Sequence, residues 1–206
     1  CVSNSTADVI DEAAPVIDSI TFIEPLCNGY STGSASVYTS GGTAPFTYQW
    51  DDPASQTAQT AVALQDGLYA VQVTDANGCI AFQLVNLTEP SQLFAVADLD
   101  RTICYGDSTQ VWASGQGGTP FLNGTYTVTW DNLPNIGSAP VTVAPLTTTQ
   151  YCATVVDANG CLPVSSCVTI TVTPPLALTI TPPIDICADG AVDLIATATG
   201  GDTLTN

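Results

Sequence analysis

The chain has 206 residues with one arginine, no lysine, no histidine and 19 acidic residues, which give a formal net charge of −18. Nucleic acid and anionic lipid surfaces are therefore excluded as expected partners, because both require clustered cationic side chains. Without histidine or lysine, the Ser-His-Asp, Cys-His and lysine-based catalytic schemes are also excluded, so we expect no enzyme. No run of about 18 apolar residues is present, so we expect no membrane insertion.

The first complete repeat is expected over residues 16–90, after a last strand of a preceding repeat in residues 1–15. Apolar and polar residues alternate in short runs that are bounded by Gly, Pro and Asn, which predicts β-strands. No segment has a helical period. The expected strands are 17–23, 34–40, 46–50, 61–64, 67–74 and a last strand ending near residue 87.

The same order of features returns in residues 91–175. The sequence Asp-Ala-Asn-Gly-Cys occupies 75–79 and again 157–161, 82 positions apart. Asn-Gly between two apolar runs predicts a tight hairpin, so each repeat is expected to end in the same turn. A Gly-Gly turn precedes the third strand of each copy, and a third, truncated repeat is expected in residues 176–206.

Aromatic residues recur at matching places in the two copies. Trp50 and Trp130 end the third strand, and Tyr69 and Tyr151 begin the penultimate strand. A buried Trp and a Tyr in these positions, in repeats of this size, are typical of immunoglobulin-like β-sandwiches. The predicted fold class is therefore all-β, with tandem immunoglobulin-like repeats. Trp112 has no counterpart in the first copy and is the candidate for a ligand-binding platform.

Eight cysteines indicate an oxidising, extracytoplasmic setting. Parity along the last hairpin of the second repeat places Cys152 and Cys167 opposite each other on the outer face of the sheet. Their positions are symmetric about the turn between Asn159 and Gly160, where Cβ separations suit a disulfide. This pair is the first predicted disulfide.

The cysteines that recur in every repeat allow two pairings. Counting within each repeat favours Cys27 with Cys79 and Cys104 with Cys161. Topology favours Cys27 with Cys161, because the head of one sandwich and its own last hairpin lie at opposite ends. In both pairings the expected role is structural stabilisation rather than redox chemistry.

Four motifs follow one another in the first copy: LCNG (26–29), SGGTAPFTYQW (40–50), DGLYAVQVTDANGC (66–79) and LTEP (87–90). The second copy has ICYG (103–106) and TTTQY (147–151). In this order, the motifs of the first copy resemble the SprB-type repeat of giant surface adhesins in gliding Bacteroidota. The second copy is more similar to the related immunoglobulin-like or PKD-like modules of the same proteins.

This resemblance implies export by the type 9 secretion system and display as long filaments on the cell surface. Such filaments adhere to substrata and, in gliding cells, are carried along the cell body. No catalytic residues come with the family. The implied localisation is extracellular, at the cell surface.

Acidic residues near the expected junctions are candidates for calcium binding, since calcium takes several oxygen ligands. The candidates are Asp98, Asp100 and Asp185. The alternative is a solvated, self-repelling surface that keeps filaments soluble. No other cofactor is expected.

Short sequons for glycosylation also occur. Asp-Ser/Thr motifs mark O-glycosylation candidates at Ser19, Ser108 and Thr203. Asn-x-Ser/Thr motifs lie at Asn4, Asn86 and Asn123.

The sequence therefore predicts a structural repeat segment of a secreted bacterial surface adhesin or filament, acting in adhesion and as a stalk. Expected partners are neighbouring repeats or other filament subunits, with surface glycans or the substratum as further ligands. Two alternatives remain open. The first alternative is a carbohydrate-binding module of a secreted enzyme. The second is a surface-fibre subunit that polymerises noncovalently through an exposed edge strand.

Overall fold

The computed structural model describes residues 13–134, 137–180, 186 and 191–201. The chain divides into two compact units, Cys1–Gln92 and Leu93–Asn206, which we call unit 1 and unit 2. Each unit has a hydrophobic core of its own. No helix able to cross a bilayer occurs in the described part of the chain.

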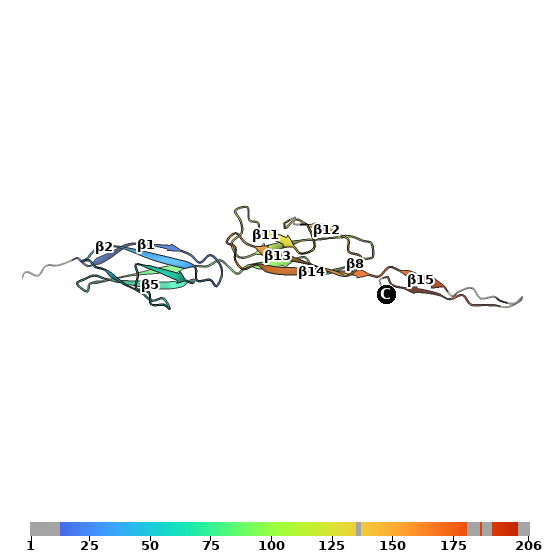
Figure 1. Cartoon of the computed structure of the whole chain (residues 1–206), viewed down its shortest axis with the longest axis horizontal. Coiled ribbons are helices and arrows are strands. Elements are labelled where there is room, and N and C mark those ends of the chain that lie inside the picture. The colour runs from blue at the N-terminus through green and yellow to red at the C-terminus, as the bar shows by residue number, and fades with distance from the viewer. Residues whose placement is uncertain (1–12, 135–136, 181–185, 187–190, 202–206) are drawn as a thin grey trace, which may run out of the picture. The chain divides into compact units, whose positions relative to one another are not determined.

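Unit 1 is a sandwich of two three-stranded antiparallel sheets (Figure 1). The strand orders are β1-β2-β4 and β3-β5-β6. These are the A-B-E and C-F-G orders of an immunoglobulin-like sandwich, so the predicted fold class is confirmed. The strands are β1 (Pro15–Ile23), β2 (Gly33–Gly41), β3 (Thr47–Trp50), β4 (Thr60–Leu64), β5 (Gly67–Thr74) and β6 (Ile80–Leu87).

The core of unit 1 follows from the alternation of side chains along its strands. Tyr69, Val71 and Val73 of β5 point inward and are buried, while the residues between them are more exposed. Trp50 is buried at the end of β3, and its Nε1 donates a hydrogen bond to the Ala58 carbonyl at 2.9 Å. The Trp and Tyr that were predicted as core residues therefore occupy the centre of the sandwich.

Unit 2 repeats this plan with one added pairing. Its larger sheet has the order β11-β13-β14-β8, and its other layer consists of the pairs β10-β7 and β12-β9. The region that corresponds to β2 of unit 1 is divided at Trp112 into the two short strands β9 and β10. The strands are β7 (Phe94–Ala97), β8 (Arg101–Cys104), β9 (Thr109–Val111), β10 (Ala113–Gln116), β11 (Thr127–Trp130), β12 (Val141–Val143), β13 (Thr149–Val156) and β14 (Val164–Thr173).

The added pairing joins the first and last parts of unit 2. After β7 pairs with β10, the chain crosses to the other layer, where β8 runs parallel to β14 from Ile170↔Arg101 to Thr173↔Cys104. In the core, the parity that was expected for the last hairpin is present. The buried residues of this hairpin are Tyr151, Ala153, Val155, Val168 and Ile170, and Trp130 of β11 belongs to the same core.

Beyond β14, the strands β15 (Ala177–Ile180) and β16 (Ala196–Thr199) form an antiparallel hairpin whose residues are all exposed. A third, truncated repeat in residues 176–206 remains a prediction. The expected last strand of a preceding repeat falls almost entirely in residues 1–12, outside the described residues.

Candidate functional site

The repeated Asp-Ala-Asn-Gly-Cys sequence forms the same turn in both units. In unit 1, Oδ1 of Asp75 accepts the backbone N–H of Asn77 at 3.0 Å and that of Cys79 at 2.8 Å. In unit 2, Oδ1 of Asp157 accepts the N–H of Cys161 at 3.0 Å. The aspartate therefore closes the hairpin with its side chain, as Asx turns do.

The other carboxylate oxygen of each aspartate holds the Gly-Gly-Thr turn that precedes the third strand. Oδ2 of Asp75 accepts the N–H of Thr43 at 3.0 Å, and Oδ2 of Asp157 accepts the N–H of Thr119 at 2.9 Å. Each asparagine then donates from Nδ2 to the threonine Oγ1, at 3.0 Å in both units. We call this set of hydrogen bonds the turn lock.

The glycine before each threonine leaves room for the turn lock. Gly118 has a φ of +56°, and a Cβ placed there would lie 2.7 Å from Oδ2 of Asp157. Gly42 has a φ of +62°, and its Cβ would lie 3.1 Å from Oδ2 of Asp75. Glycine is required at both places by backbone conformation and by the close approach of the carboxylate.

Both aspartates are almost wholly buried, with 5% exposure for Asp75 and 2% for Asp157. The hydrogen bond from the Thr43 N–H is the main cause that lowers the pKa of Asp75, and it outweighs the opposing effect of burial. For Asp52, burial alone would raise the pKa, but hydrogen bonds from Gln56 and Ala54 lower it overall. The lowered pKa values of Asp75 and Asp52 keep these two carboxylates charged, so that they organise the backbone around them.

At the other end of unit 1, side chains join residues 24–29, which follow β1 and which we call the head segment, to the segment that follows β6. The Glu89 carboxylate accepts the N–H of Gly29 at 2.6 Å and a hydrogen bond from the Asn28 amide. Thr88 Oγ1 donates to Glu24 Oε1 at 2.7 Å. Pro25 and Pro90 lack the N–H that a backbone ladder would need, so side chains replace it here.

In unit 2, the first and last segments are joined by backbone hydrogen bonds. The residues that correspond to this head segment form β8, which pairs in parallel with the end of β14. Asp100 extends the pairing, because its Oδ1 accepts the N–H of Thr169 at 2.7 Å. The first and last segments of unit 2 are therefore joined by a strand ladder, whereas those of unit 1 are joined by carboxylate hydrogen bonds.

Cys152 and Cys167 face each other across β13 and β14 and form the disulfide that strand parity predicts. Their Cα atoms lie 4.0 Å apart. The bond lies on the outer face, because the alternate residues Tyr151 and Val168 are buried in the core.

The predicted pairs Cys27–Cys79 and Cys104–Cys161 are wrong. Cys79 and Cys104 are free thiols, whereas Cys27 and Cys161 are each disulfide-bonded. The physical reason is the length of the last strand. Cys27 lies in the head segment beside the end of β6, and Cys79 directly precedes the start of that eight-residue strand. Eight residues of strand span roughly 26 Å, far beyond disulfide reach.

The same reasoning applies in unit 2. Cys104 pairs with Thr173 at the end of β14, and Cys161 lies before the start of this ten-residue strand. Pairing of Cys27 with Cys161 stays a prediction.

The calcium candidates are used within the fold. Asp98 forms a salt bridge with Arg101, with Oδ2 and Nη2 2.5 Å apart, and Asp100 binds the Thr169 backbone. Asp185 lies outside the described residues. Among the residues that the structure describes, no group of three or more His, Cys, Asp or Glu is arranged to hold a metal ion.

The remaining predicted site residues are spread over the surface. Trp112 is 38% exposed at the break between β9 and β10, and it lines none of the hollows described below. Two of the O-glycosylation candidates, Ser19 and Ser108, are exposed, as are Asn86 and Asn123. Thr203 and Asn4 lie outside the described residues.

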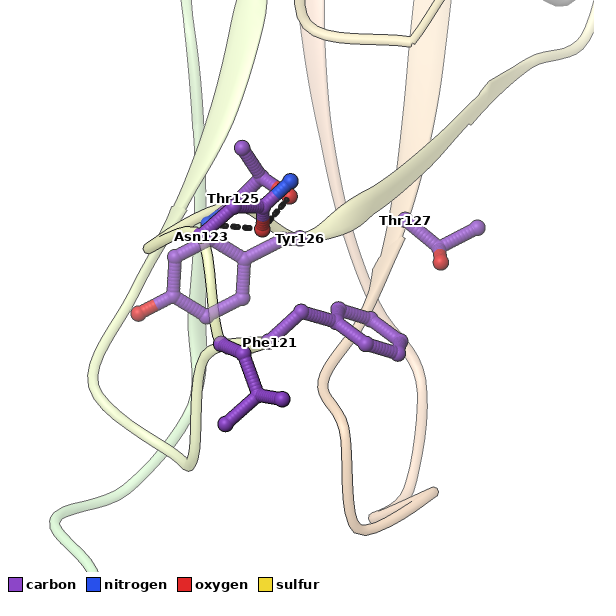
Figure 2. A pocket seen from close by; sticks show the side chains of 6 residues that line it. Phe121, Asn123, Thr125, Tyr126 and Thr127 are labelled. Carbon is purple, nitrogen blue, oxygen red and sulfur yellow. Dashed lines mark hydrogen bonds between the residues drawn. The ribbon is translucent and has the colours of Figure 1, made fainter.

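An open hollow of about 530 Å³ lies on the loop that is inserted before β11 (Figure 2). Asn123 folds back in this loop, and its Oδ1 accepts hydrogen bonds from the N–H and the hydroxyl of Thr125. Tyr126 is anchored by a hydrogen bond to the Gly117 carbonyl at 2.8 Å. No site was predicted here from the sequence. The signal that could have indicated one is the pair of apolar residues Phe121 and Leu122 among glycine, proline and polar residues, in a segment longer than its counterpart in the first copy. The hollow is lined by Phe121, Leu122, Asn123, Thr125, Tyr126 and Thr127.

Comparison with known proteins supports the resemblance on part of unit 1. Residues 19–55 match the family model of the SprB repeat, which confirms the resemblance over that segment. The match covers the second half of β1, all of β2 and β3, and the start of the loop that contains Asp52. Curated proteins yield no match to the chain. The SprB repeat and the immunoglobulin-like fold are both non-catalytic types of module.

Solved structures with weak overall similarity are arrays of immunoglobulin domains. The N-terminal eight domains of Down Syndrome Cell Adhesion Molecule are 15% identical, with a TM-score of 0.39, and cover 78% of this chain and 25% of theirs. Sidekick-1 immunoglobulin domains 1–5 are 13% identical, with a TM-score of 0.36. The alignment covers 83% of this chain and 41% of the Sidekick-1 chain. A mutated variant of the three titin domains I67–I69 is 14% identical, with a TM-score of 0.44. The alignment covers 93% of this chain and 90% of the titin chain.

The chain thus spans less than half of the length of the first two of these structures. The fold assignment rests on the sheets and cores described above.

Proposed function

We propose that this chain is a structural repeat segment of a secreted bacterial surface adhesin or filament, and that it serves as a stalk without catalysis. The turn lock carries the proposal. In each unit a buried carboxylate holds two turns of the backbone together, and this arrangement occurs twice in matching places. A repeated scaffold needs such an arrangement, whereas an enzyme needs titratable groups that converge on an open cleft.

The SprB match and the disulfide support the same proposal. Disulfides form and persist in oxidising compartments, so the chain is of the secreted, extracellular type. Export by the type 9 secretion system, display on the cell surface and a contribution to gliding are the finer parts of the proposal. Neighbouring repeats of the same chain or other filament subunits are its expected partners.

The test is surface labelling of intact cells with antibodies raised against the 206-residue chain. We expect labelling on wild-type cells and its loss in cells that lack type 9 secretion. In-frame deletion of the segment is expected to weaken adhesion to glass. Labelling that requires cell lysis would contradict the proposal.

Glycan binding is a second candidate, favoured by the hollow on the inserted loop of unit 2. An aromatic ring beside amide and hydroxyl groups suits a sugar, which has an apolar face and polar edges. A glycan array with the wild-type chain and the Phe121→Ala and Trp112→Ala variants separates the two locations. Binding that depends on Phe121 would place the ligand in this hollow, and binding that depends on Trp112 would place it at the break between β9 and β10.

A further inference from the structure

The outer face of the β3-β5-β6 sheet in unit 1 carries a row of large apolar side chains. Ile80, Phe82 and Leu84 alternate along β6 and are 49%, 65% and 58% exposed. Leu68 on the neighbouring strand is 62% exposed, and Ala70 lies directly opposite Leu84. Exposed apolar residues are ordinary when scattered, but a contiguous group on one sheet face marks an interaction surface.

The corresponding face of unit 2 serves as an internal reference. Its residues at matching parity on β14 are Ser165, Cys167, Thr169 and Thr171. They are hydroxyl-bearing, apart from the cysteine that is closed in the disulfide with Cys152. The fold therefore does not require an apolar outer face at this sheet. Unit 1 has the apolar row, and the matching strand of unit 2 does not.

Charge restricts what can cover this face. The twenty residues of β3, β5 and β6 include no Asp, Glu, Lys or Arg, in a chain whose net charge is −18. Two copies of so acidic a chain repel each other over most of their surfaces. The carboxylate of Asp51 borders the face directly after β3, and it accepts the Ala70 N–H at 2.7 Å. The row of apolar side chains on β6 is therefore a place where two copies can approach with less repulsion than over the rest of the surface.

The shape of the face also suits an apolar partner. A hollow of about 330 Å³ lies beside Phe82, between Gln49 and Gln72 on the neighbouring strands, with Trp50 among its lining residues. It is large enough to receive an apolar side chain from an opposing sheet. Sheets that pack face to face interdigitate their side chains in this manner.

We propose that the outer face of the β3-β5-β6 sheet binds the same face of a second copy of this chain. The contact is isologous, so Phe82 and Leu84 of each copy enter the interface together with those of the other. Lateral pairing of chains through unit 1 is distinct from the end-to-end role of a stalk. It gives neighbouring chains a way to associate side by side.

Sedimentation equilibrium of the full 206-residue chain, over about a hundredfold range of concentration, tests the proposal. We expect a reversible dimer in the wild-type chain. The double variant Phe82→Ser, Leu84→Ser is expected to raise the dimer Kd by about tenfold or more, because central apolar anchors dominate such interfaces. Both side chains are exposed, so the thermal unfolding of the monomer should change little.

The matched control is Phe121→Ser, Leu122→Ser, which removes exposed apolar side chains from the inserted loop of unit 2. It is expected to leave the dimer Kd unchanged. A wild-type chain that stays monomeric, or a dimer weakened equally by both double variants, would overturn the proposal. Concentration-dependent amide NMR shifts in the wild-type chain give an independent readout. They should concentrate at residues 68–72 and 80–84, and shifts confined to other residues would also overturn it.

Discussion

Oδ2 of Asp75 accepts the backbone N–H of Thr43 at 3.0 Å across a separation of 32 residues. Asp157 makes the same contact with Thr119 at 2.9 Å, although 38 residues separate them. The extra residues of unit 2 are accommodated between the two turns without loss of the contact. The turn lock is therefore the fixed part of the repeat, and the segments that it encloses vary in length.

Replacement of the buried aspartate of unit 2 tests how far the unit depends on this contact. Asp157→Ala leaves the N–H groups of Thr119 and Cys161 without their acceptor inside the protein. Because hydrogen bonds to charged groups contribute about 1.5–3 kcal/mol each, the loss of two predicts that unit 2 loses about 3 kcal/mol or more of unfolding free energy. Urea denaturation followed by tryptophan fluorescence measures this loss. The exposed Asp131→Ala is the control, and an equal loss in both variants would refute the assignment.

The lowered pKa of Asp75 predicts the direction of a pH dependence. The folded-state pKa lies below the unfolded value of about 3.9, so the charged carboxylate stabilises the folded state fully above that value. This contribution is lost as the pH falls through the folded pKa. We expect Asp75→Asn to flatten the denaturation midpoint as a function of pH below about pH 4. Asp66→Asn, at an exposed position, is the comparison, and a slope unchanged by Asp75→Asn would contradict the prediction.

The core and the strands of unit 1 could be predicted because the signal is local. Alternation along β5 places Tyr69, Val71 and Val73 on one face, and Gly-rich turns mark where the strand ends. Strand parity likewise suffices for Cys152 and Cys167, because a hairpin fixes which residues lie opposite each other.

The features that could not be predicted depend on contacts between segments that are distant in sequence. The parallel pairing of β8 with β14 joins residues about seventy positions apart, as the Thr173–Ile103 hydrogen bond illustrates with a separation of 70. No periodicity in a four-residue strand reveals its partner. The predicted pairing of Cys27 with Cys79 and of Cys104 with Cys161 was wrong for a related reason. Regular spacing of cysteines along the chain does not indicate which end of a sandwich each cysteine occupies.

Removal of the disulfide in unit 2 has a predictable cost. Cys152 and Cys167 are separated by 15 residues, and closing a loop of that length restricts the unfolded chain by about 3 kcal/mol. The double variant Cys152→Ser, Cys167→Ser should therefore lower the unfolding free energy of unit 2 by about that amount. Differential scanning calorimetry measures this, with unit 1 as the internal control. A shift shared equally by both units would contradict a local role.

Thiol labelling distinguishes the free cysteines from the bonded ones. Under non-reducing conditions in denaturant, we expect iodoacetamide to modify Cys79 and Cys104 and to spare Cys27, Cys152, Cys161 and Cys167. Peptide mass spectrometry reads out each site and identifies the partner of Cys27. Full modification of all six after reduction is the control. Labelling of Cys27 with protection of Cys79 would restore the pairing within the repeat.

The two ways of joining first and last segments predict different mechanical strengths. In unit 2, β8 and β14 run parallel, so pulling the chain ends draws the strands in opposite directions and loads their hydrogen bonds together in shear. In unit 1, the equivalent place is held by hydrogen bonds that the Glu89 and Glu24 carboxylates accept from the Gly29 N–H and the Thr88 hydroxyl. We therefore expect unit 2 to unfold at the higher force in single-molecule stretching.

The unit that unfolds in each event can be identified from the length of chain that the event releases. In a Cys27→Ser, Cys161→Ser chain, reduction releases the 15-residue loop between Cys152 and Cys167 and should lengthen the unit 2 event by roughly 50 Å. The unit 1 event should keep its length, which makes it the control within each molecule. If the event that lengthens on reduction occurs at the lower force, the parallel pairing does not bear the load, and the carboxylate hydrogen bonds of unit 1 are the stronger connection.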